Sequence, residues 1–599
     1  MPKSIVMKHL VLSISLVLLA CCGSINAAQK QTGPDLRPIP GEVIDHKGIV
    51  INPAPIEITN PYSGIFNMSS GFKINIADYP EYKSVLSNLP IKENGIPLKL
   101  SVGKNSKLKE LPGGYTLSIG PDDIKIVGYD KRGVFYGLQT LCQITGSLES
   151  EGSNDLPMME IADYPSLVNR GVVEGFYGTP WSHDTRLSII DFMGKNKMNC
   201  YVYGPKDDPY HRTPSWREPY PDQEATKIAE LADRCKQNYI NFVWAIHPGG
   251  DIRWDNADYQ NLLNKFEHMY GLGVRQFAIF FDDISGNGTD SHKQAKLLND
   301  LNRDFVENKP DVSPLIVCPT DYNQDWANPS DDGQLAIYGR ELNPSTEVFW
   351  TGKVVCGDIE KESLDFVDSR IKRPALVWWN FPVTDYCKHN LLLGPVYGLD
   401  TTLTDKNLSG LLSNPMENGE ASISALYGVA DYGWNPAGYN AFDNWTRSFE
   451  VVMPGAAEAY GTFAIHSADP PKNYRRNESW NIETFDCNNY TPEQYESLYS
   501  EFKRISEAEE QIVSSGKNLA LIKELAPWLV EFTNLGNRGL MALELLKIKE
   551  NVNRDEFEQA HRRLSVINDI QKPGYLNHRS GTLKLQPFID DVLQQLSFK

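Results

Sequence analysis

The sequence is short of two features, and each shortage excludes a class of protein. Positive charge is the first: 58 Lys and Arg stand against 77 Asp and Glu, which gives a net charge of −19. Because binding to nucleic acid depends on basic patches that neutralise phosphates, this balance argues against a nucleic-acid partner. Long apolar runs are the second. None occurs beyond residue 30, so we expect no membrane-spanning helix in the rest of the chain.

Cysteine is also scarce, with 9 in 599 residues. Cys21 and Cys22 are adjacent near the N terminus, and the others are scattered and odd in number. Cys200 and Cys318 lie in apolar stretches, which favours small buried side chains over metal ligands. Cys387 and the nearby His389 have no matching pair at zinc-site spacing, so we expect no metal and no other cofactor.

Residues 1–28 have the form of a secretory signal. Lys3 and Lys8 precede an apolar run over residues 10–20, which is too short for a stable membrane-spanning helix. Leu18-Leu19-Ala20-Cys21 resembles a bacterial lipobox, which implies cleavage before Cys21 and a lipid anchor on it. The alternative is cleavage near Ala27-Ala28, which releases a soluble protein. We therefore expect an exported bacterial protein, periplasmic or held as a lipoprotein at the outer membrane or cell surface, where disulfides can persist.

The chain is too long for one core and divides into three parts after the signal. Residues 30–165 alternate short strands with turns: 115–119 and 124–127 form a hairpin, and a helix follows from Gly133 to Ile144, which predicts a small α/β accessory domain. Residues 456–599 are predicted to form a helical bundle. There, Thr491-Pro492-Glu493-Gln494 is typical of a helix start, and further apolar helical stretches lie at 519–529, 540–548 and 588–596.

Residues 166–455 show a regular alternation, with apolar strand candidates and room for a helix between most of them. The candidates begin near Val168, Asn199, Asn241, Gln276, Leu315, Val348, Ala375 and Leu408. Eight such units predict a (β/α)8 TIM barrel, whose ligands bind at the carboxyl ends of the strands. Residues suited to a binding site follow every one of these strands.

Two adjacent carboxylates follow the fourth strand candidate. Asp282 and Asp283 come directly after the apolar run 277–281, a pattern typical of a strand buried on both faces. Neighbouring carboxyl groups that meet different environments can divide the acid and base roles of catalysis. An isolated pair could equally be a helix cap and a solvated side chain. The position of this pair at the barrel mouth favours a catalytic site.

Five segments, in this order, resemble glycoside hydrolase family 84, which contains the O-GlcNAcases and bacterial β-N-acetylglucosaminidases. They are residues 170–181 (RGVVEGFYGTPW), 203–211 (YGPKDDPYH), 281–285 (FDDIS), 378–385 (WWNFPVTD) and 413–416 (SNPM). The resemblance implies an exo-β-N-acetylglucosaminidase that retains configuration through an oxazoline formed by the substrate's own acetamido group. Its substrates would be glycans or glycoproteins with terminal β-linked N-acetylglucosamine, including O-GlcNAc.

The resemblance also implies a role for each site residue. Asp282 would orient and polarise the acetamido N–H, and Asp283 would protonate the leaving oxygen and later deprotonate water. Tyr322 would reach the acetamido oxygen, while Thr351 and Trp378 would wall the acetyl pocket. The sugar hydroxyls would be bound by Lys206, Asn380, Asp385, Asn414 and the Gly175 carbonyl. From the residues alone, Lys206 could be a solvated loop side chain, Asp385 a helix cap and Trp378 barrel core.

Two other functions remain open from the sequence. A family 20 hexosaminidase uses a similar barrel and the same assisted mechanism, but that family would place an Asp-Glu pair where this chain has Asp282 and Asp283. A non-catalytic, glycan-binding surface lipoprotein on a disabled barrel would be favoured by a missing acid, and both acids are present. Hydrolysis of a chromogenic N-acetylglucosaminide separates catalysis from binding.

Overall fold

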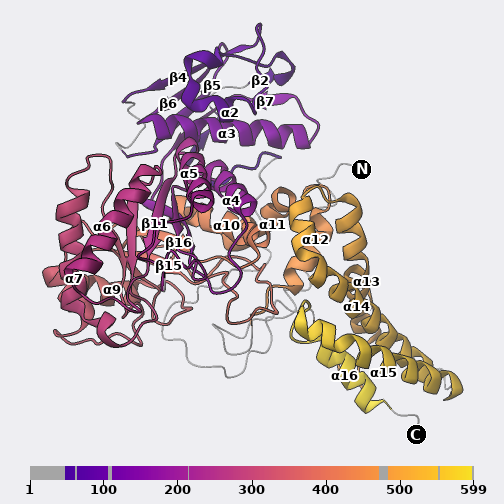
Figure 1. Cartoon of the computed structure of the whole chain (residues 1–599). Helices are drawn as coiled ribbons and strands as arrows, with labels where there is room; N and C mark the ends of the chain where they lie inside the picture. Colours follow the sequence, from indigo (N-terminus) through magenta and orange to yellow (C-terminus); the bar gives the residue numbers. More distant parts are fainter. Residues whose placement is uncertain are drawn as a thin grey trace.

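The structure is a computed structural model that describes residues 48–60, 64–104, 111–213, 215–470, 483–550 and 554–596. The signal and lipobox predicted around Cys21 lie outside these residues. An α/β domain, a barrel and a set of long helices follow one another along the chain, and the helices extend away from one flank of the barrel (Figure 1). Within the described ranges, no helix combines the length and apolar character needed to cross a membrane.

In the described part of the chain, eight parallel strands close into a barrel, which confirms the predicted fold class. The strands are β9 (Asn169–Glu174), β10 (Cys200–Tyr203), β11 (Asn241–Ile246), β12 (Gln276–Phe280), β13 (Ile316–Cys318), β14 (Glu347–Trp350), β15 (Ala375–Trp379) and β16 (Leu408–Ser413). Each begins within one residue of its predicted start. β9 pairs with both β10 and β16, which closes the ring.

Successive residues of the strands face opposite sides of the barrel wall. In β12, Ala278 and Phe280 belong to the cluster that fills the barrel interior, whereas Phe277, Ile279 and the following Phe281 pack outward against the helices. This two-residue period explains why an uninterrupted apolar run forms the strand, since both of its faces are buried. It also directs Asp282, two residues beyond Phe280, toward the barrel axis.

Helices follow seven of the eight strands within the described residues. They are α4 (His183–Lys195), α5 (Asp222–Gln237), α6 (Asn256–Gly271), α7 (Ser291–Leu301), α8 (Gln334–Glu341), α9 (Lys361–Ile371) and α10 (Gly419–Trp434). The connection from β15 to β16, residues 380–407, contains no helix. This long loop leaves the mouth of the barrel beside α10 and bears Asp385.

The N-terminal domain is built on a sheet with the strand order β1-β8-β5-β6-β4-β3. These strands are β1 (Glu57–Thr59), β3 (Phe72–Lys73), β4 (Ile96–Val102), β5 (Tyr115–Ile119), β6 (Ile124–Gly128) and β8 (Met159–Asp163), with a separate pair of β2 (Ile65–Asn67) and β7 (Asp155–Pro157). β5 and β6 are antiparallel, which confirms the predicted hairpin. The short α2 (Lys83–Leu86) and the predicted helix, which is α3 (Lys131–Ser150), complete the domain. The apolar face of α3 is fully buried.

This domain contacts the barrel at the amino ends of the strands, opposite the mouth. Lys197, just before β10, donates to the Tyr115 hydroxyl at 2.9 Å and lies 3.2 Å from the Asp163 carboxylate, and all three side chains are fully buried. Trp434, at the end of α10, donates its indole N–H to Asp163 at 2.7 Å. The accessory domain therefore supports the base of the barrel rather than its ligand-binding end.

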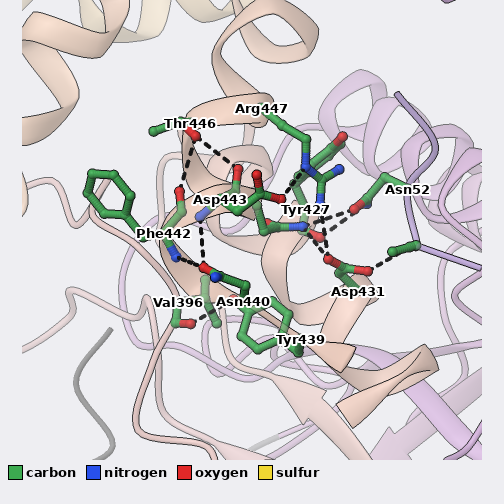
Figure 2. A network of polar contacts seen from close by, with 12 residues as sticks. Asn52, Val396, Tyr427, Asp431, Tyr439, Asn440, Phe442, Asp443, Thr446 and Arg447 are labelled. Carbon is green, nitrogen blue, oxygen red and sulfur yellow. Dashed lines mark hydrogen bonds and ion pairs between the residues drawn. The ribbon is translucent and has the colours of Figure 1, made fainter. Parts of the chain in front are cut away.

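A second buried junction joins the segment before β1 to α10 and α11 (Ala441–Val452) (Figure 2). Asp431 of α10 accepts hydrogen bonds from the Ala54 backbone N–H at 2.7 Å and from Asn444 at 2.8 Å. Arg447 lies 3.4 Å from Asp431, and both side chains are almost completely buried. The Asn444 amide also donates to Asn52 at 3.0 Å. These bonds compensate the buried charge of Asp431, which would otherwise be costly.

The C-terminal helices are α12 (Ala457–His466), α13 (Pro492–Ser515), α14 (Leu519–Glu550), α15 (Arg554–Asn577) and α16 (Leu585–Gln595). Thr491 and Gln494 form the predicted capping box at the start of α13. The apolar stretches 519–529 and 540–548, expected as separate segments, are parts of the single helix α14. The N-terminal part of α14 also packs against α10, so the bundle reaches the barrel near its mouth.

Candidate active site

All ten residues predicted for the site lie at the carboxyl ends of the barrel strands. The two acids follow β12, and the others follow β9, β10, β13, β14, β15 or β16, apart from Trp378, which is the penultimate residue of β15. They are Gly175, Lys206, Asp282, Asp283, Tyr322, Thr351, Trp378, Asn380, Asp385 and Asn414. This end of a barrel is where its ligands bind. Hydrogen bonds, an ion pair and ring packing join these residues into adjoining groups.

Asp282 and Lys206 form a buried ion pair. The Lys206 ammonium donates to Oδ2 of Asp282, and both side chains are less than one-tenth exposed. Burial alone would raise the pKa of Asp282, but the adjacent positive charge and hydrogen bond of Lys206 more than offset it and lower the pKa to about 2. Asp282 is therefore an anion throughout the neutral and mildly acidic range.

The other oxygen of the same carboxylate is available to a ligand. Oδ1 of Asp282 is buried and accepts no hydrogen bond from any residue the structure describes. It lies 3.6 Å from Nε2 of His247, whose ring donates instead to the Asp282 backbone carbonyl at 2.7 Å. Burial lowers the pKa of His247. A buried anionic oxygen of this kind is suited to accept one N–H or O–H bond from a bound ligand.

Asp283 lies beside this pair in a different environment. Its side chain is exposed, and its backbone is left-handed with φ of 53°, a conformation that Asp tolerates better than most residues. The hydroxyls of Tyr177 and Tyr322 donate to its two oxygens, each at 2.8 Å. Burial and the charge of Asp283 raise the pKa of both tyrosines, so their hydroxyls keep their protons. Adjacent carboxylates thus have separate partners and different access to solvent.

Trp378, Asn380 and Asn414 form a connected wall of the site. Trp378 packs against Phe280 with ring centres 5.3 Å apart and donates its indole N–H to Asn380. Asn380 also accepts from the Asn414 side chain at 2.9 Å. Oδ1 of Asn414 is buried and accepts no bond from the described residues. A Cβ at Gly175 would lie 2.3 Å from the Trp378 ring, so only glycine allows this close approach.

Thr351 and Asp385 contact the residues that surround Asp283. The Thr351 N–H donates to the Tyr322 carbonyl at 2.9 Å, and its side chain is buried. Asp385 accepts the backbone N–H of Tyr177 at 3.0 Å. Burial raises the pKa of Asp385, although this backbone bond opposes the rise. Through Tyr177, Asp385 is linked to Asp283.

Two residues for which the sequence predicted no role lie beside the acids. Tyr177 lies in the predicted loop after β9 and donates to Asp283, while His247 directly follows β11 and contacts Asp282. Their position after barrel strands was the available signal, because all the predicted site residues except Trp378 share that position. Nothing in the local sequence indicated which carboxylate each would meet.

Metal ligands do not gather anywhere in the described ranges: no three His, Cys, Asp or Glu side chains are placed to hold one ion. The cysteines from Cys142 to Cys487 are free in the structure, and Cys200 and Cys318 are buried as expected. The site instead offers paired carboxylates, tyrosine hydroxyls and amides. Such a set can exchange a proton with a ligand while holding a second, permanently charged oxygen against it.

Comparison with protein families gives three matches that together follow the domain order. Residues 170–465 match the model for beta-N-acetylglucosaminidase. Residues 53–164 match domain 2 of glycosyl hydrolase family 20, and residues 480–592 match the post-catalytic domain of bacterial family 84 proteins. The family 20 match covers only the accessory domain.

Individual relatives lead to the same family. The solved structure of CpGH84B is 31% identical, with a TM-score of 0.78 over 91% of this chain and 100% of that one. An O-GlcNAc hydrolase mutant from Thermobaculum terrenum is 25% identical, with a TM-score of 0.63 over 72% of this chain and 94% of that one. The protein O-GlcNAcase of Rattus norvegicus is 36% identical over 302 residues, which make up 48% of this chain and 32% of the rat protein. The chain thus spans about a third of that relative. It has the barrel and paired acids of a glycosidase, and it belongs to glycoside hydrolase family 84.

Proposed function

We propose that this protein is a retaining exo-β-N-acetylglucosaminidase that uses the acetamido group of its substrate as the nucleophile. The observation that carries the proposal is the state of Asp282. Lys206 lowers its pKa to about 2 although it is buried, and its Oδ1 accepts no bond from the described residues. A fixed anion with one free oxygen suits an acetamido N–H that gains positive charge as the reaction proceeds.

In the first step, the acetamido oxygen attacks the anomeric carbon and the bond to the leaving oxygen breaks. Asp282 accepts the acetamido N–H and stabilises the charge that develops on the nascent oxazoline. Asp283 gives its proton to the leaving oxygen, which departs as an alcohol. Adjacent carboxylates cannot easily flank a sugar from both faces, as an enzyme nucleophile and its acid do at about 5 Å separation. The geometry therefore favours attack from within the substrate.

In the second step, Asp283 takes a proton from water, the water oxygen bonds to the anomeric carbon, and the oxazoline C–O bond breaks. The hydroxyls of Tyr177 and Tyr322, which donate to Asp283, stabilise the carboxylate form that this step needs. Two inversions at one carbon retain the β configuration. Asp283 starts the next cycle with its proton restored.

The substrates we propose carry terminal β-linked N-acetylglucosamine, on glycans or on O-GlcNAc-modified proteins. The side chains of Trp378, Thr351 and Tyr322 suit an N-acetyl group, since all three are buried and each has an aromatic ring or a methyl group. Asn414 has a buried oxygen free to accept a sugar hydroxyl. These features would bind the terminal sugar. The rest of the substrate would contact surfaces outside the barrel mouth.

Progressive fluorination of the N-acetyl group tests the proposal. Each fluorine weakens the attacking oxygen, so kcat/KM for aryl glycosides should fall stepwise while the first sugar released stays in the β form by proton NMR. Asp282→Ala should lower kcat strongly with a smaller change in ground-state binding. Asp365→Ala serves as the matched control, because Asp365 is 59% exposed and its ion-pair partner among the described residues is Lys361 on the surface of α9. Insensitivity to fluorination together with a mild Asp282→Ala phenotype would mean that an enzyme carboxylate attacks instead.

We propose further that the protein is exported and carries a lipid anchor on Cys21. The supporting features are Lys3, Lys8, the apolar run and the lipobox-like residues before Cys21. Mass spectrometry of the mature protein should find an N-terminal diacylated cysteine, and Cys21→Ser should abolish membrane attachment. A mature chain that begins after Ala28 would instead mean that the protein has no lipid anchor and is released in soluble form.

A further inference from the structure

The helical bundle contacts the barrel at the loop that bears Asp385 and at the first turn of α10, which directly follows the loop of Asn414. Helix α14 makes a contact at each of these places, through Trp528 and Glu524 respectively. These residues are four positions apart and therefore lie on one face of the helix. The N-terminal domain, by contrast, contacts the barrel at the opposite end. The bundle is thus the domain placed to influence the site.

Trp528 holds the loop of Asp385. Its indole N–H donates to the His389 carbonyl at 3.0 Å, and the backbone N–H of Arg579, in the segment between α15 and α16, donates to the same carbonyl at 2.7 Å. From His389 back to Asp385 the chain makes two successive turns, closed by the N–H of Asn390 on Cys387 and of Cys387 on Thr384. Such a tightly bonded segment transmits the position of His389 to Asp385.

Asp385 in turn reaches the general acid. It accepts the Tyr177 backbone N–H at 3.0 Å, and the Tyr177 hydroxyl donates to Asp283 at 2.8 Å. A continuous series of hydrogen-bonded groups therefore runs from the bundle to Asp283. Trp528 itself is 7% exposed and lies 4.9 Å from the His578 ring, so the bundle fixes its orientation.

Glu524 holds the helix that follows the loop of Asn414. Its Oε2 accepts the Ala421 backbone N–H at 2.8 Å, at the start of α10. The residue at the cap position, Asn418, makes no side-chain cap bond, so a carboxylate from another domain serves the orphan N–H groups of this helix. The first turn of α10 is bonded back to the site loop, because Ser422 Oγ accepts the Met416 N–H at 2.9 Å. Asn414 is two residues earlier.

We propose that Glu524 and Trp528 are positioning residues of the active site, through which the helical bundle sets the places of Asn414 and Asp385. The inference deepens the proposed glycosidase function and rests on it for the part that concerns catalysis. Trp528→Phe removes the indole donor and keeps an aromatic ring. Glu524→Leu removes the cap, and Glu524→Gln keeps an amide oxygen that can accept the same bond.

Kinetics with an aryl β-N-acetylglucosaminide test the first half. Trp528→Phe and Glu524→Leu should each lower kcat/KM by about two- to ten-fold, the effect of one lost hydrogen bond, and Glu524→Gln should recover most of the loss. Tyr495→Phe is the matched control, since it removes a hydroxyl that donates at 3.3 Å to the Leu543 carbonyl within the bundle. It should leave kcat/KM unchanged.

Double variants show whether the effect passes through the named residues. The loss from Trp528→Phe should disappear in an Asp385→Ala background and persist in Asn414→Ala, and Glu524→Leu should show the reverse. Equal losses in every background would mean general destabilisation and would overturn the proposal.

Hydrogen exchange tests the same idea without reference to activity. Trp528→Phe should speed amide exchange over residues 383–390, and Glu524→Leu over residues 419–422, with Tyr495→Phe changing neither. Unchanged exchange in both segments refutes the positioning role, as does faster exchange with unaltered kcat/KM. If the wild-type protein hydrolysed no N-acetylglucosaminide, the proposed function would fail, and the exchange result would still decide whether α14 holds the loops.

Discussion

Replacing Lys206 with methionine should move a catalytic pKa in a direction that the structure specifies. Lys206→Met keeps a long side chain but removes the ammonium that pairs with Asp282. The two opposing influences on Asp282 are burial, which raises its pKa, and the neighbouring positive charge, which lowers it. Without Lys206, burial is left opposed mainly by the electrostatic influence of His247, which lies 3.6 Å from Oδ1, and by a backbone hydrogen bond. The pKa of Asp282 should then rise.

The size of the change follows from the wild-type value. The pKa of Asp282 is about 2 rather than 3.8, a difference equivalent to about 2 kcal/mol in favour of the anion. Because burial opposes this difference, the combined contribution of Lys206, His247 and the backbone exceeds it, and Lys206 is the largest of the three. We therefore expect the pKa of Asp282 in Lys206→Met at about 3 to 5, because one opposite charge shifts the pKa of a carboxyl group by about 1 to 3. In the wild type, the stabilisation that this group contributes is present above about pH 4 and is lost as the pH falls toward 2.

The assay is the pH profile of kcat/KM for an aryl β-N-acetylglucosaminide. In the wild type, Asp282 should contribute no acid limb above about pH 3. In Lys206→Met, kcat/KM should fall about ten-fold per pH unit below the new pKa, since a protonated Asp282 cannot stabilise the acetamido N–H. Lys206→Arg keeps the charge and should leave the limb at low pH. Any loss of sugar binding lowers the whole curve without moving its limb. An acid limb at the same pH in wild type and Lys206→Met would refute the reasoning.

Four further predictions follow from the site and the junctions. Asp283→Asn should slow hydrolysis of substrates with poor leaving groups by about 10² to 10⁴ and affect activated aryl glycosides less; equal losses across a leaving-group series would contradict its role as the acid. Gly175→Ala should lower kcat/KM by at least ten-fold, because its Cβ would lie 2.3 Å from the Trp378 ring, and an unchanged value would show that the ring can move. Asp431→Ala should lower the free energy of unfolding by about 3 kcal/mol in urea titrations, since it leaves buried partners unpaired, whereas the exposed Asp365→Ala should change it by less than about 1 kcal/mol. Treatment with EDTA should leave the hydrolysis rate unchanged, and a loss restored by one divalent ion would overturn the expectation that no metal takes part.

The barrel and the place of its acids were predictable because their signals are local. A strand buried on both faces needs an uninterrupted apolar run, and the two-residue period of a strand directs Asp282 inward once Phe280 faces the interior. The capping box of Thr491 and Gln494 likewise depends on neighbouring residues only. The roles of Lys206 and Asp385 at the site, however, came from family resemblance, since their local sequence fits a solvated loop or a helix cap equally well.

Only the tertiary structure decided which groups meet. Lys206 and Asp282 are 76 residues apart and become partners because the barrel closes and excludes water around them. Tyr177 reaches Asp283 across 106 residues, and no local pattern distinguishes it from other tyrosines in loops. The contact of Trp528 with the Asp385 loop depends on how two domains dock. Alternation and capping are properties of consecutive residues, whereas ion pairing and domain contacts depend on packing between distant segments, so the sequence alone could specify the first and not the second.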